Sequence, residues 1–232
     1  MSPAELRRVN DEGAENHGSQ EIVVIRRRCR RCRARRLRQL RRPNGFGGGC
    51  PHRQKPSDAI QYVTPGTTAD HPYPTLTKNY HYEIELVAVL DKGGRNVGIE
   101  QALALVYGYT IGLDMTRRDL QRAMGDEKKP WEIGKSFDRS VPIGPIHPVA
   151  RVGHFTKGAI SLKVNGAVKQ SADLNQMIWS VAEQISKLSQ AFELMPGDII
   201  YSGTPENVGP VVVGDVMQGS IAGLPTLDVR VV

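Results

Sequence analysis

The chain has 232 residues, of which 39% are hydrophobic, and a formal net charge of +7. This length is enough for one sizeable core, so we expect one main domain. No apolar run approaches the roughly 20 residues that span a bilayer. No secretory signal is evident, because the apolar stretch at residues 21–25 is short and the arginines follow it instead of preceding it. We therefore expect no membrane partner.

The positive charge is concentrated at the N-terminus. Residues 1–52, here called the basic head, hold 13 of the 31 Lys and Arg residues and 5 of the 24 Asp and Glu residues, a net charge of +8 that leaves −1 for the remainder. A nearly neutral body does not attract polyanions, so we expect no nucleic-acid partner for it. All three cysteines, Cys29, Cys32 and Cys50, lie in the basic head. A main domain without thiols fits a reducing, cytoplasmic location.

The basic head differs from the rest of the chain in composition. An arginine-rich run over residues 26–42 is followed by the glycines of residues 45–49, which is poor material for a packed core. From about residue 53 the composition is that of a globular domain, with turn residues between apolar runs. We therefore expect an atypical, disordered segment over 1–52 and one folded domain over 53–232.

The first half of the domain alternates between strand and helix patterns. Residues 80–90 alternate and are rich in Tyr, Ile, Val and Leu, which predicts a strand that ends at the turn over 91–94. Apolar residues at 99, 103, 106 and 107 recur at helical spacing and predict a helix to about Thr110. A second helix is expected to begin near Thr116, a residue type that favours the N-cap position.

The second half begins with a predicted hairpin. Residues 159–164 and 168–170 flank Asn165-Gly166, a dipeptide that readily adopts a type I′ turn. Apolar residues at 177, 181, 185 and 188 predict a helix, and strands are expected over 198–202 and 226–232. Strands outnumber helices and are joined mostly by hairpins, so the predicted fold class is α+β and β-rich.

Three acidic residues form the candidate chemical site. Glu83 and Glu85 lie two positions apart in a predicted strand, so their side chains point to the same face. A solvated face is the simpler interpretation for such a pair. This strand is strongly hydrophobic, however, and uncompensated charge would be costly there unless a cation were bound. Asp114 adds a third carboxylate at the end of the predicted helix, although alone it would be a cap or turn residue. Three carboxylates suit Mg²⁺ or Mn²⁺ better than zinc.

The segment His81-Tyr82-Glu83-Ile84-Glu85-Leu86 resembles the H-x-E-x-E strand of the fumarylacetoacetate hydrolase family. Further segments follow in the order of that family, and together they cover the chain from Gln54 to the C-terminus. They are Gly108-Tyr109, residues 113–121, Trp131, residues 134–138, Gly144-Pro145, residues 164–166, Gln170, Leu188-Ser189, residues 196–198, residues 203–205 and residues 208–210. The ordered set is specific, and it implies the family's mixed β-sandwich roll.

The resemblance also implies roles for individual residues. Glu83, Glu85 and Asp114 would bind the metal, Lys135 would be catalytic, Gln121 would lie near the substrate, and Thr204 would contact the substrate carboxylate. Arg118 is a further candidate for substrate binding, with an ion pair to Asp119 as the alternative. A 1,3-diketo acid can chelate the metal through adjacent oxygens, and the metal with Lys135 can stabilise the departing pyruvate enolate.

One family segment is absent from the sequence. Members usually carry N-Y-x-x-H-x-x-E before the metal strand, and its His and Glu activate the attacking water. His17 and Glu21 are one residue too far apart for this pattern, so we assign them no role. A site without its general base is expected to lose on the order of 10² to 10⁴ in rate.

Two hypotheses address the basic head. The residues Gln39-Leu40-Arg41-Arg42-Pro43 can be encoded by CAA CTA CGC CGC CCA, and a shift of one base then reads Asn-Tyr-Ala-Ala followed by His or Gln. The head is thus interpreted as a frame-shifted stretch of a GC-rich gene. In the alternative, Cys29, Cys32, Cys50 and His52 bind zinc and the arginines contact phosphates.

The resemblance implies a cytoplasmic, homodimeric hydrolase of an acylpyruvate that depends on Mg²⁺ or Mn²⁺. Similarity over residues 73–80 and 144–148 favours fumarylpyruvate, cleaved to fumarate and pyruvate in aromatic catabolism. The alternatives are an oxaloacetate decarboxylase or a diketo-acid isomerase of the same family, or a catalytically impaired member that lacks the His/Glu pair.

Overall fold

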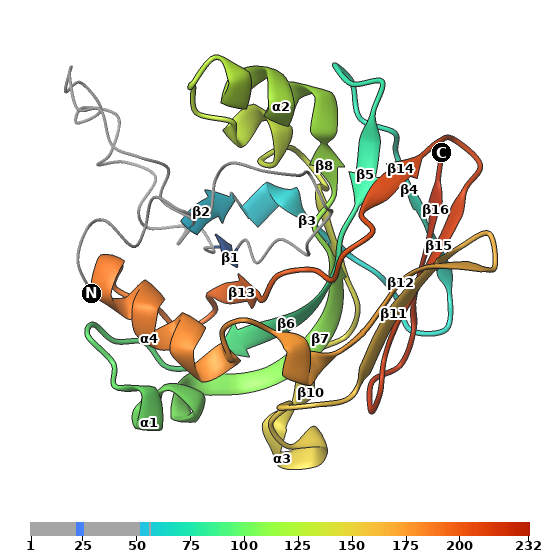
Figure 1. The fold of residues 1–232 in the computed structure, drawn as a ribbon. Coiled ribbons are helices and arrows are strands. Elements are labelled where there is room, and N and C mark those ends of the chain that lie inside the picture. The colour runs from blue at the N-terminus through green and yellow to red at the C-terminus, as the bar shows by residue number, and fades with distance from the viewer. Residues whose placement is uncertain (1–21, 26–51, 56) are drawn as a thin grey trace.

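The computed structural model describes residues 22–25, 52–55 and 57–232 (Figure 1). Within these residues the strands form three sheets. The large sheet has the order β2 (His52–Lys55), β1 (Ile22–Ile25), β13 (Ile199–Tyr201), β6 (Ile84–Leu90), β7 (Val106–Leu113), β9 (Val141–Ile143) and β3 (Ile60–Tyr62), and β10 (His147–Pro148) also pairs with β7.

The other two sheets are smaller. The five-stranded sheet has the order β12 (Ala167–Asp173), β11 (Ala159–Val164), β15 (Val216–Ile221), β16 (Leu227–Val231) and β4 (Thr68–His71). The three-stranded sheet consists of β14 (Gly209–Val211), β5 (Tyr80–Tyr82) and β8 (Thr116–Arg117). The chain enters the large sheet directly from the small one, because β5 and β6 are separated only by Glu83.

Helices are short and lie around the sheets, as Figure 1 shows. The α-helices are α1 (Ile99–Ala102), α2 (Arg118–Asp126), α3 (Val149–Val152) and α4 (Val181–Ala191), and the 3₁₀ turns are η3 (Ser57–Ala59), η4 (Leu103–Leu105), η5 (Glu132–Gly134) and η6 (Leu174–Gln176). The longest, α4, begins with a capping box in which Ser180 and Glu183 satisfy each other's backbone N–H groups. None of the described helices has the length and apolar character needed to cross a membrane.

The two faces of β6 have different surroundings. Ile84, Leu86, Ala88 and Leu90 belong to the main core, which also includes Leu162 and Met217 of the five-stranded sheet and Ile185 and Leu188 of α4. Val87 and Val89 belong to a smaller cluster with Ile143, Ile199 and Tyr201. Every residue of β6 is buried, and Glu85 is among them. The strand therefore holds one carboxylate inside the protein.

The helix predicted from residue 99 to about residue 110 is wrong beyond Leu105. Helical residues are confined to α1 and η4, and the chain then enters β7, which pairs antiparallel with β6 from Val106 to Leu113. Long-range pairing outweighs the helical spacing of the apolar residues, and Val, Tyr, Thr and Ile favour a strand here. A Cβ at Gly108 would lie 2.3 Å from the backbone oxygen of His147, so this β7 position accepts β10 only as glycine.

Other predicted elements are confirmed with shifted ends. The hairpin of β11 and β12 turns at Asn165 and Gly166, whose φ angles are 52° and 81°, as a type I′ turn requires. The helix predicted near Met177 begins at Val181, and the strands near the C-terminus are β13 and β16. Thr116 lies in β8, and the cap position of α2 is Arg117.

Part of the basic head lies within the described residues. β1 pairs antiparallel with β13 and parallel with β2, so five residues of the head, 22–25 and His52, join the large sheet. The expected boundary between residues 52 and 53 falls inside β2. His17, Glu21, the three cysteines and residues 39–43 lie outside the described residues, so the interpretations of the head remain predictions.

Candidate metal centre

Three buried carboxylates converge where β5, β6 and β7 meet. Glu83 lies between β5 and β6, Glu85 is the second residue of β6, and Asp114 follows β7 directly. Each offers an oxygen, and these oxygens all lie within 4.8 Å of one another. The pairing of β6 with β7 continues past the strand end, because the Asp114 N–H donates to the Glu83 carbonyl at 2.8 Å. Adjacent antiparallel strands thus carry all three side chains.

Asp114 was expected at the end of a helix and lies instead at the end of β7. Its place in the cluster follows from this correction, since Ile84 pairs with Leu113 and the next residue must lie beside Glu83. Glu83 was expected inside a continuous strand, but it marks the break between β5 and β6. The two glutamates nevertheless present oxygens to the same point.

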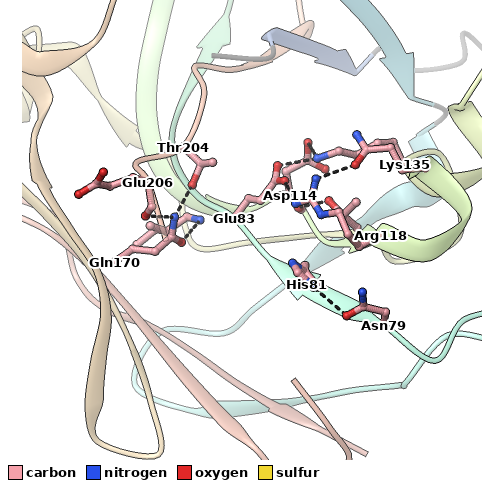
Figure 2. A network of polar contacts seen from close by, with 12 residues as sticks. Asn79, His81, Glu83, Asp114, Arg118, Lys135, Gln170, Thr204 and Glu206 are labelled. Atoms are coloured by element: carbon pink, nitrogen blue, oxygen red, sulfur yellow. Dashed lines mark hydrogen bonds and ion pairs between the residues drawn. The ribbon is translucent and has the colours of Figure 1, made fainter. Parts of the chain in front are cut away.

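Cationic side chains surround the carboxylates. Lys135 Nζ lies 2.5 Å from Glu83 Oε2 and 3.0 Å from Asp114 Oδ2. Lys55 pairs with the other oxygen of Asp114. Arg118 pairs with the other oxygen of Glu83 (Figure 2). Both lysine side chains are completely buried. Within the described part of the chain, three positive groups thus face three carboxyl groups, which offsets much of the cost of burying them.

The three carboxyl groups are not equally compensated. Burial raises the pKa of Asp114, but the opposing effects of Lys135 and Lys55 together are larger and leave its pKa below the usual value. Burial, followed by repulsion from Asp114 and Glu83, holds the pKa of Glu85 well above its usual value. The Gly203 N–H donates to Glu85 Oε2 at 2.6 Å and only partly offsets this. Glu85 is therefore the carboxyl group with most to gain from a bound cation.

The donor set fits a hard divalent cation. All three candidate ligands are carboxylates, which suit Mg²⁺ and Mn²⁺. Two oxygens bound about 2.1 Å from such an ion lie at most about 4 Å apart. The 4.8 Å limit on the separations in this structure is close to that value, so small side-chain movements would suffice. Among the described residues, the His, Cys, Asp and Glu side chains close enough to share a metal ion are Glu83, Glu85 and Asp114.

Arg118 and Gln121 lie together on α2. Arg118 donates through NH1 to Gln121 Oε1 at 2.6 Å, and its other terminal nitrogen contacts Glu83. The alternative of an ion pair with Asp119 is not what the structure shows, since Asp119 accepts hydrogen bonds from Thr77 and from the Lys78 and Leu120 N–H groups. The guanidinium thus connects α2 to the carboxylate cluster.

Thr204 lies in the loop that follows β13. Its neighbour Gly203 contacts Glu85, so the loop borders the carboxylate cluster. Thr204 also lines a cavity of about 550 Å³ together with Met177, Pro205 and Glu206. The structure therefore places the site residues expected from the sequence in one region. Lys135 and Arg118 contact the carboxylates directly, and Gln121 and Thr204 lie at the edge of the region.

His81 lies beside this region without contacting a carboxylate. Its Nε2 is 2.8 Å from Asn79 Oδ1 (Figure 2). Burial, followed by the positive charge of Arg118, lowers the pKa of His81 to about 4. The ring is therefore neutral at pH 7.

Two residues in this region had no assigned role in the sequence. Lys55 has no recognisable signal, because a single lysine beside the basic head is expected at the surface. Its burial follows from β2, which joins the edge of the large sheet and directs Lys55 to Asp114. Gln170 was visible only as one point of family resemblance, yet it is completely buried and contacts the loop that carries Thr204.

Comparison with known proteins agrees with this geometry. The family model for the fumarylacetoacetate (FAA) hydrolase C-terminal domain matches residues 47–232. The chain is 46% identical to a fumarylpyruvate hydrolase from Ralstonia sp over 159 residues, which cover 68% of this chain and 82% of that protein. It is 37% identical to a mitochondrial oxaloacetate decarboxylase from Dictyostelium discoideum over 153 residues, which cover 66% of this chain and 70% of that protein.

A solved structure is also similar. The crystal structure of fumarylpyruvate hydrolase from Pseudomonas aeruginosa in complex with Mn²⁺ and pyruvate superposes with a TM-score of 0.77 at 49% identity, and covers 93% of this chain and 90% of that one. The expected β-rich α+β fold is confirmed by this match and by the three sheets. The chain belongs to the fumarylacetoacetate hydrolase family of enzymes.

Proposed function

We propose that this chain is a hydrolase that depends on Mg²⁺ or Mn²⁺ and cleaves the carbon-carbon bond of an acylpyruvate, with fumarylpyruvate as the first candidate. The observation that carries the proposal is the convergence of Glu83, Glu85 and Asp114 on one buried point. Similarity to fumarylpyruvate hydrolases from two bacteria supports the choice of substrate. The products would be fumarate and pyruvate.

The three carboxylates would hold the cation. Bound there, a divalent ion supplies Lewis-acid stabilisation of negative charge on the oxygens of the diketo acid. Lys135 would add a second positive charge at the same place, because its Nζ already lies within 3.0 Å of Glu83 and Asp114. A buried ammonium group near developing negative charge acts in a region of low dielectric and needs little reorganisation.

Substrate orientation would come from the edge of the site. Arg118 and Gln121 offer hydrogen bonds to polar groups of the substrate from α2. Thr204 would contact the carboxylate of the pyruvate moiety from the opposite loop. In the reaction, water adds to the acyl carbonyl, the carbon-carbon bond breaks, and the pyruvate fragment takes up a proton. Among the described residues we assign no base for the water.

The test is a panel of acylpyruvates assayed with Mg²⁺ or Mn²⁺ and with EDTA. We expect fumarylpyruvate to be the best substrate, EDTA to abolish turnover, and Asp114→Asn to lose at least about 10²-fold in kcat/KM. The same assay is done with a chain whose residues 26–51 are replaced by the corresponding segment of the Ralstonia relative. Turnover that persists in EDTA, or in the absence of Asp114, would contradict the proposal.

A second candidate activity is decarboxylation of oxaloacetate. The observation that favours it is the similarity to the Dictyostelium oxaloacetate decarboxylase. Oxaloacetate is also a keto acid with two adjacent oxygens, so the same residues could bind it. Release of CO₂ from oxaloacetate at a higher kcat/KM than hydrolysis of any acylpyruvate would select this alternative.

The remaining predictions concern the chain as a whole. We propose that the basic head is a frame-shifted stretch, that the catalytic domain extends over 53–232, and that the protein is a cytoplasmic homodimer. Resequencing the gene tests the first point, since the idea requires codons that give Asn-Tyr-x-x-His in another frame. Zinc content and salt-dependent DNA binding of the isolated peptide 1–52 would favour the zinc module instead. Sedimentation tests the dimer.

A further inference from the structure

Gln170 lies where β13 separates from β6. The ladder between these strands includes the pair Tyr201 and Val87 and ends with the Ser202 N–H donating to the Leu86 carbonyl at 3.1 Å. The chain then turns away through Gly203, whose φ is +96°. Beyond this point on β6, the Ile84 N–H has no backbone partner among the described residues. It donates instead to Gln170 Oε1 at 3.1 Å.

A β-bulge directs Gln170 into this gap. Leu162 pairs with Gln170, but the next residue, Lys163, pairs with Val168, so Lys169 is the extra residue of β12. Bulges commonly redirect a side chain in this way. Gln170 is completely buried, whereas its neighbours from 167 to 169 and residue 171 are exposed. A polar side chain from the five-stranded sheet thus reaches the strand that carries Glu83 and Glu85.

The other end of the Gln170 amide contacts the loop after β13. Nε2 lies 3.0 Å from Thr204 Oγ1, 2.8 Å from the Pro205 carbonyl and 3.2 Å from the Glu206 carbonyl (Figure 2). The orientation of the amide is fixed by its partners. The Ile84 N–H can only donate, so it needs Oε1, and the two carbonyls can only accept, so they need Nε2.

This arrangement determines the role of the Thr204 hydroxyl. An amide nitrogen cannot accept a hydrogen bond, so Thr204 Oγ1 must be the acceptor in its contact with Nε2. The hydrogen of the hydroxyl then points elsewhere, and within the described residues it has no acceptor. The neighbouring carbonyls of Pro205 and Glu206 are held by the same amide. The loop therefore offers an O–H donor at the cavity that Thr204 lines, one residue from Gly203, which contacts Glu85.

We propose that Gln170 is a positioning residue that fixes the Thr204 hydroxyl as a hydrogen-bond donor to the substrate carboxylate and ties it to the metal-ligand strand. The inference rests on the proposed function, in which Thr204 contacts that carboxylate. It deepens that function because one buried amide links the backbone between Glu83 and Glu85 to the anion-binding loop. Ligand strand and loop would therefore keep a constant separation.

Pyruvate binding to the Mn²⁺-loaded full chain tests the proposal without requiring turnover. Gln170→Glu keeps an oxygen that accepts from Ile84 and removes the Nε2 donor. The Pro205 and Glu206 carbonyls then lose their partner, and the Thr204 hydroxyl can donate to the new oxygen instead of to the substrate. We expect pyruvate to bind about 10- to 100-fold more weakly, the value of a hydrogen bond to a charged group. Thr204→Val should give a similar loss, and Thr204→Ser should give little.

The double variant separates positioning from a general structural effect. If Gln170 acts through Thr204, the double variant Gln170→Glu with Thr204→Val should bind pyruvate as tightly as the single variant of lower affinity. The dissociation constant of Mn²⁺ should change by less than about threefold in every variant. Gln101→Glu, the same change at an exposed residue of α1, is the matched control and should leave binding unchanged.

Should Gln170→Glu fail to fold, Gln170→Met replaces it, with an expected loss of about three- to ten-fold because the hydroxyl becomes free to rotate. Multiplicative losses in the double variant, or normal pyruvate binding in both Gln170 variants, would overturn the role of Gln170 alone. If the wild-type chain binds Mn²⁺ but no pyruvate, or if Thr204→Val binds pyruvate normally, the proposed function of Thr204 fails and the inference falls with it.

Discussion

The two faces of β6 are both buried, but in different surroundings. On one face, Ile84, Leu86 and Leu90 pack into the main core and need only apolar neighbours. On the other face, Glu85 lies in line with Val87 and Val89, close to Glu83 and Asp114. The residues of the first face are stabilised by removal from water. The carboxylates beside the second face need opposite charge, which Lys55, Lys135 and Arg118 supply to Glu83 and Asp114.

This difference between the two faces indicates where a bound cation can stabilise the protein. A packed apolar face has no polar group left to satisfy, so it gains nothing from an ion. The carboxylate face, by contrast, holds groups whose charge is only partly balanced, and the raised pKa of Glu85 is the clearest sign of this. Perturbed ionisable groups cluster at functional sites for this reason. Substitutions on the two faces should therefore respond differently to Mn²⁺.

The largest effect is expected for Lys55→Met on the charged face. Removing one partner of a completely buried ion pair leaves the Asp114 carboxylate short of positive charge. We expect the free energy of unfolding to fall by about 3–5 kcal/mol without metal. Saturating Mn²⁺ should recover part of the loss, because the cation replaces the missing charge. Urea denaturation measures both values, with the exposed Lys92→Met as control. A loss below about 1 kcal/mol would contradict the importance of this pair.

Leu86→Ala makes the corresponding change on the apolar face. Leu86 is 0% exposed within the main core, so truncation leaves a cavity and should cost about 3 kcal/mol in the free energy of unfolding. The difference in unfolding free energy between Leu86→Ala and the wild type should be the same with and without Mn²⁺. A Mn²⁺-dependent recovery comparable to that of Lys55→Met would remove the distinction between the two faces.

His71 is a buried polar group that lies beside Tyr80 of the main core. Its ring nitrogens lie 2.6 Å from Gln61 Oε1 and 2.6 Å from the Tyr80 hydroxyl. Burial, followed by repulsion from Arg139, lowers the pKa of His71 from 6.5 to about 4. The unfolded chain therefore binds a proton at a higher pH than the folded one, and stability falls as the pH drops from about 6.5 to about 4.

The size of this pH effect is at most about 3 kcal/mol, from 1.36 kcal/mol for each pKa unit. It is measured as the difference in unfolding free energy between pH 7 and pH 4.5 for the wild type and for His71→Asn. We expect the difference to be smaller in the variant. An unchanged difference would show that His71 is not the group that titrates.

The smallest effect is expected at Gly112 of β7, which packs against the ring of Tyr201. A Cβ at this position would lie 2.6 Å from Tyr201 Cε1 and 2.7 Å from Val87 Cγ2. Gly112→Ala should therefore cost about 1–3 kcal/mol through overpacking. Gly98→Ala is the matched control, since its Cβ would meet nothing within 4 Å. Equal stability of the two variants in thermal denaturation would contradict the close packing beside Glu85.

The sequence predicted the site better than it predicted the elements that carry it. Glu83, Glu85 and Asp114 were brought together by family resemblance and by alternation in a strand, and they do converge. The helix expected up to Thr110 is mostly β7, because the pairing of residues 106–113 with β6 depends on contacts distant in sequence. Periodicity within a short apolar run cannot separate these two outcomes.

Lys55 and Gln170 show why other parts of the site were missed. A lysine at an element edge and a glutamine in a hairpin are ordinarily surface residues. Their burial results from the sheet order β2-β1-β13 and from the bulge in β12, and neither can be read from local composition. The β11–β12 hairpin, in contrast, was predicted closely, because Asn165 and Gly166 determine it locally.

The most direct measurement is a titration of the purified chain with Mn²⁺, in which free ion is followed by electron paramagnetic resonance. Wild-type protein should bind one Mn²⁺ per chain, and Glu85→Gln should bind at least about 10-fold more weakly because one carboxylate ligand is lost. Glu100→Gln, the same change at an exposed position, should bind like the wild type. Failure of the wild type to bind Mn²⁺, or equal affinity in Glu85→Gln, would contradict a metal centre at these carboxylates.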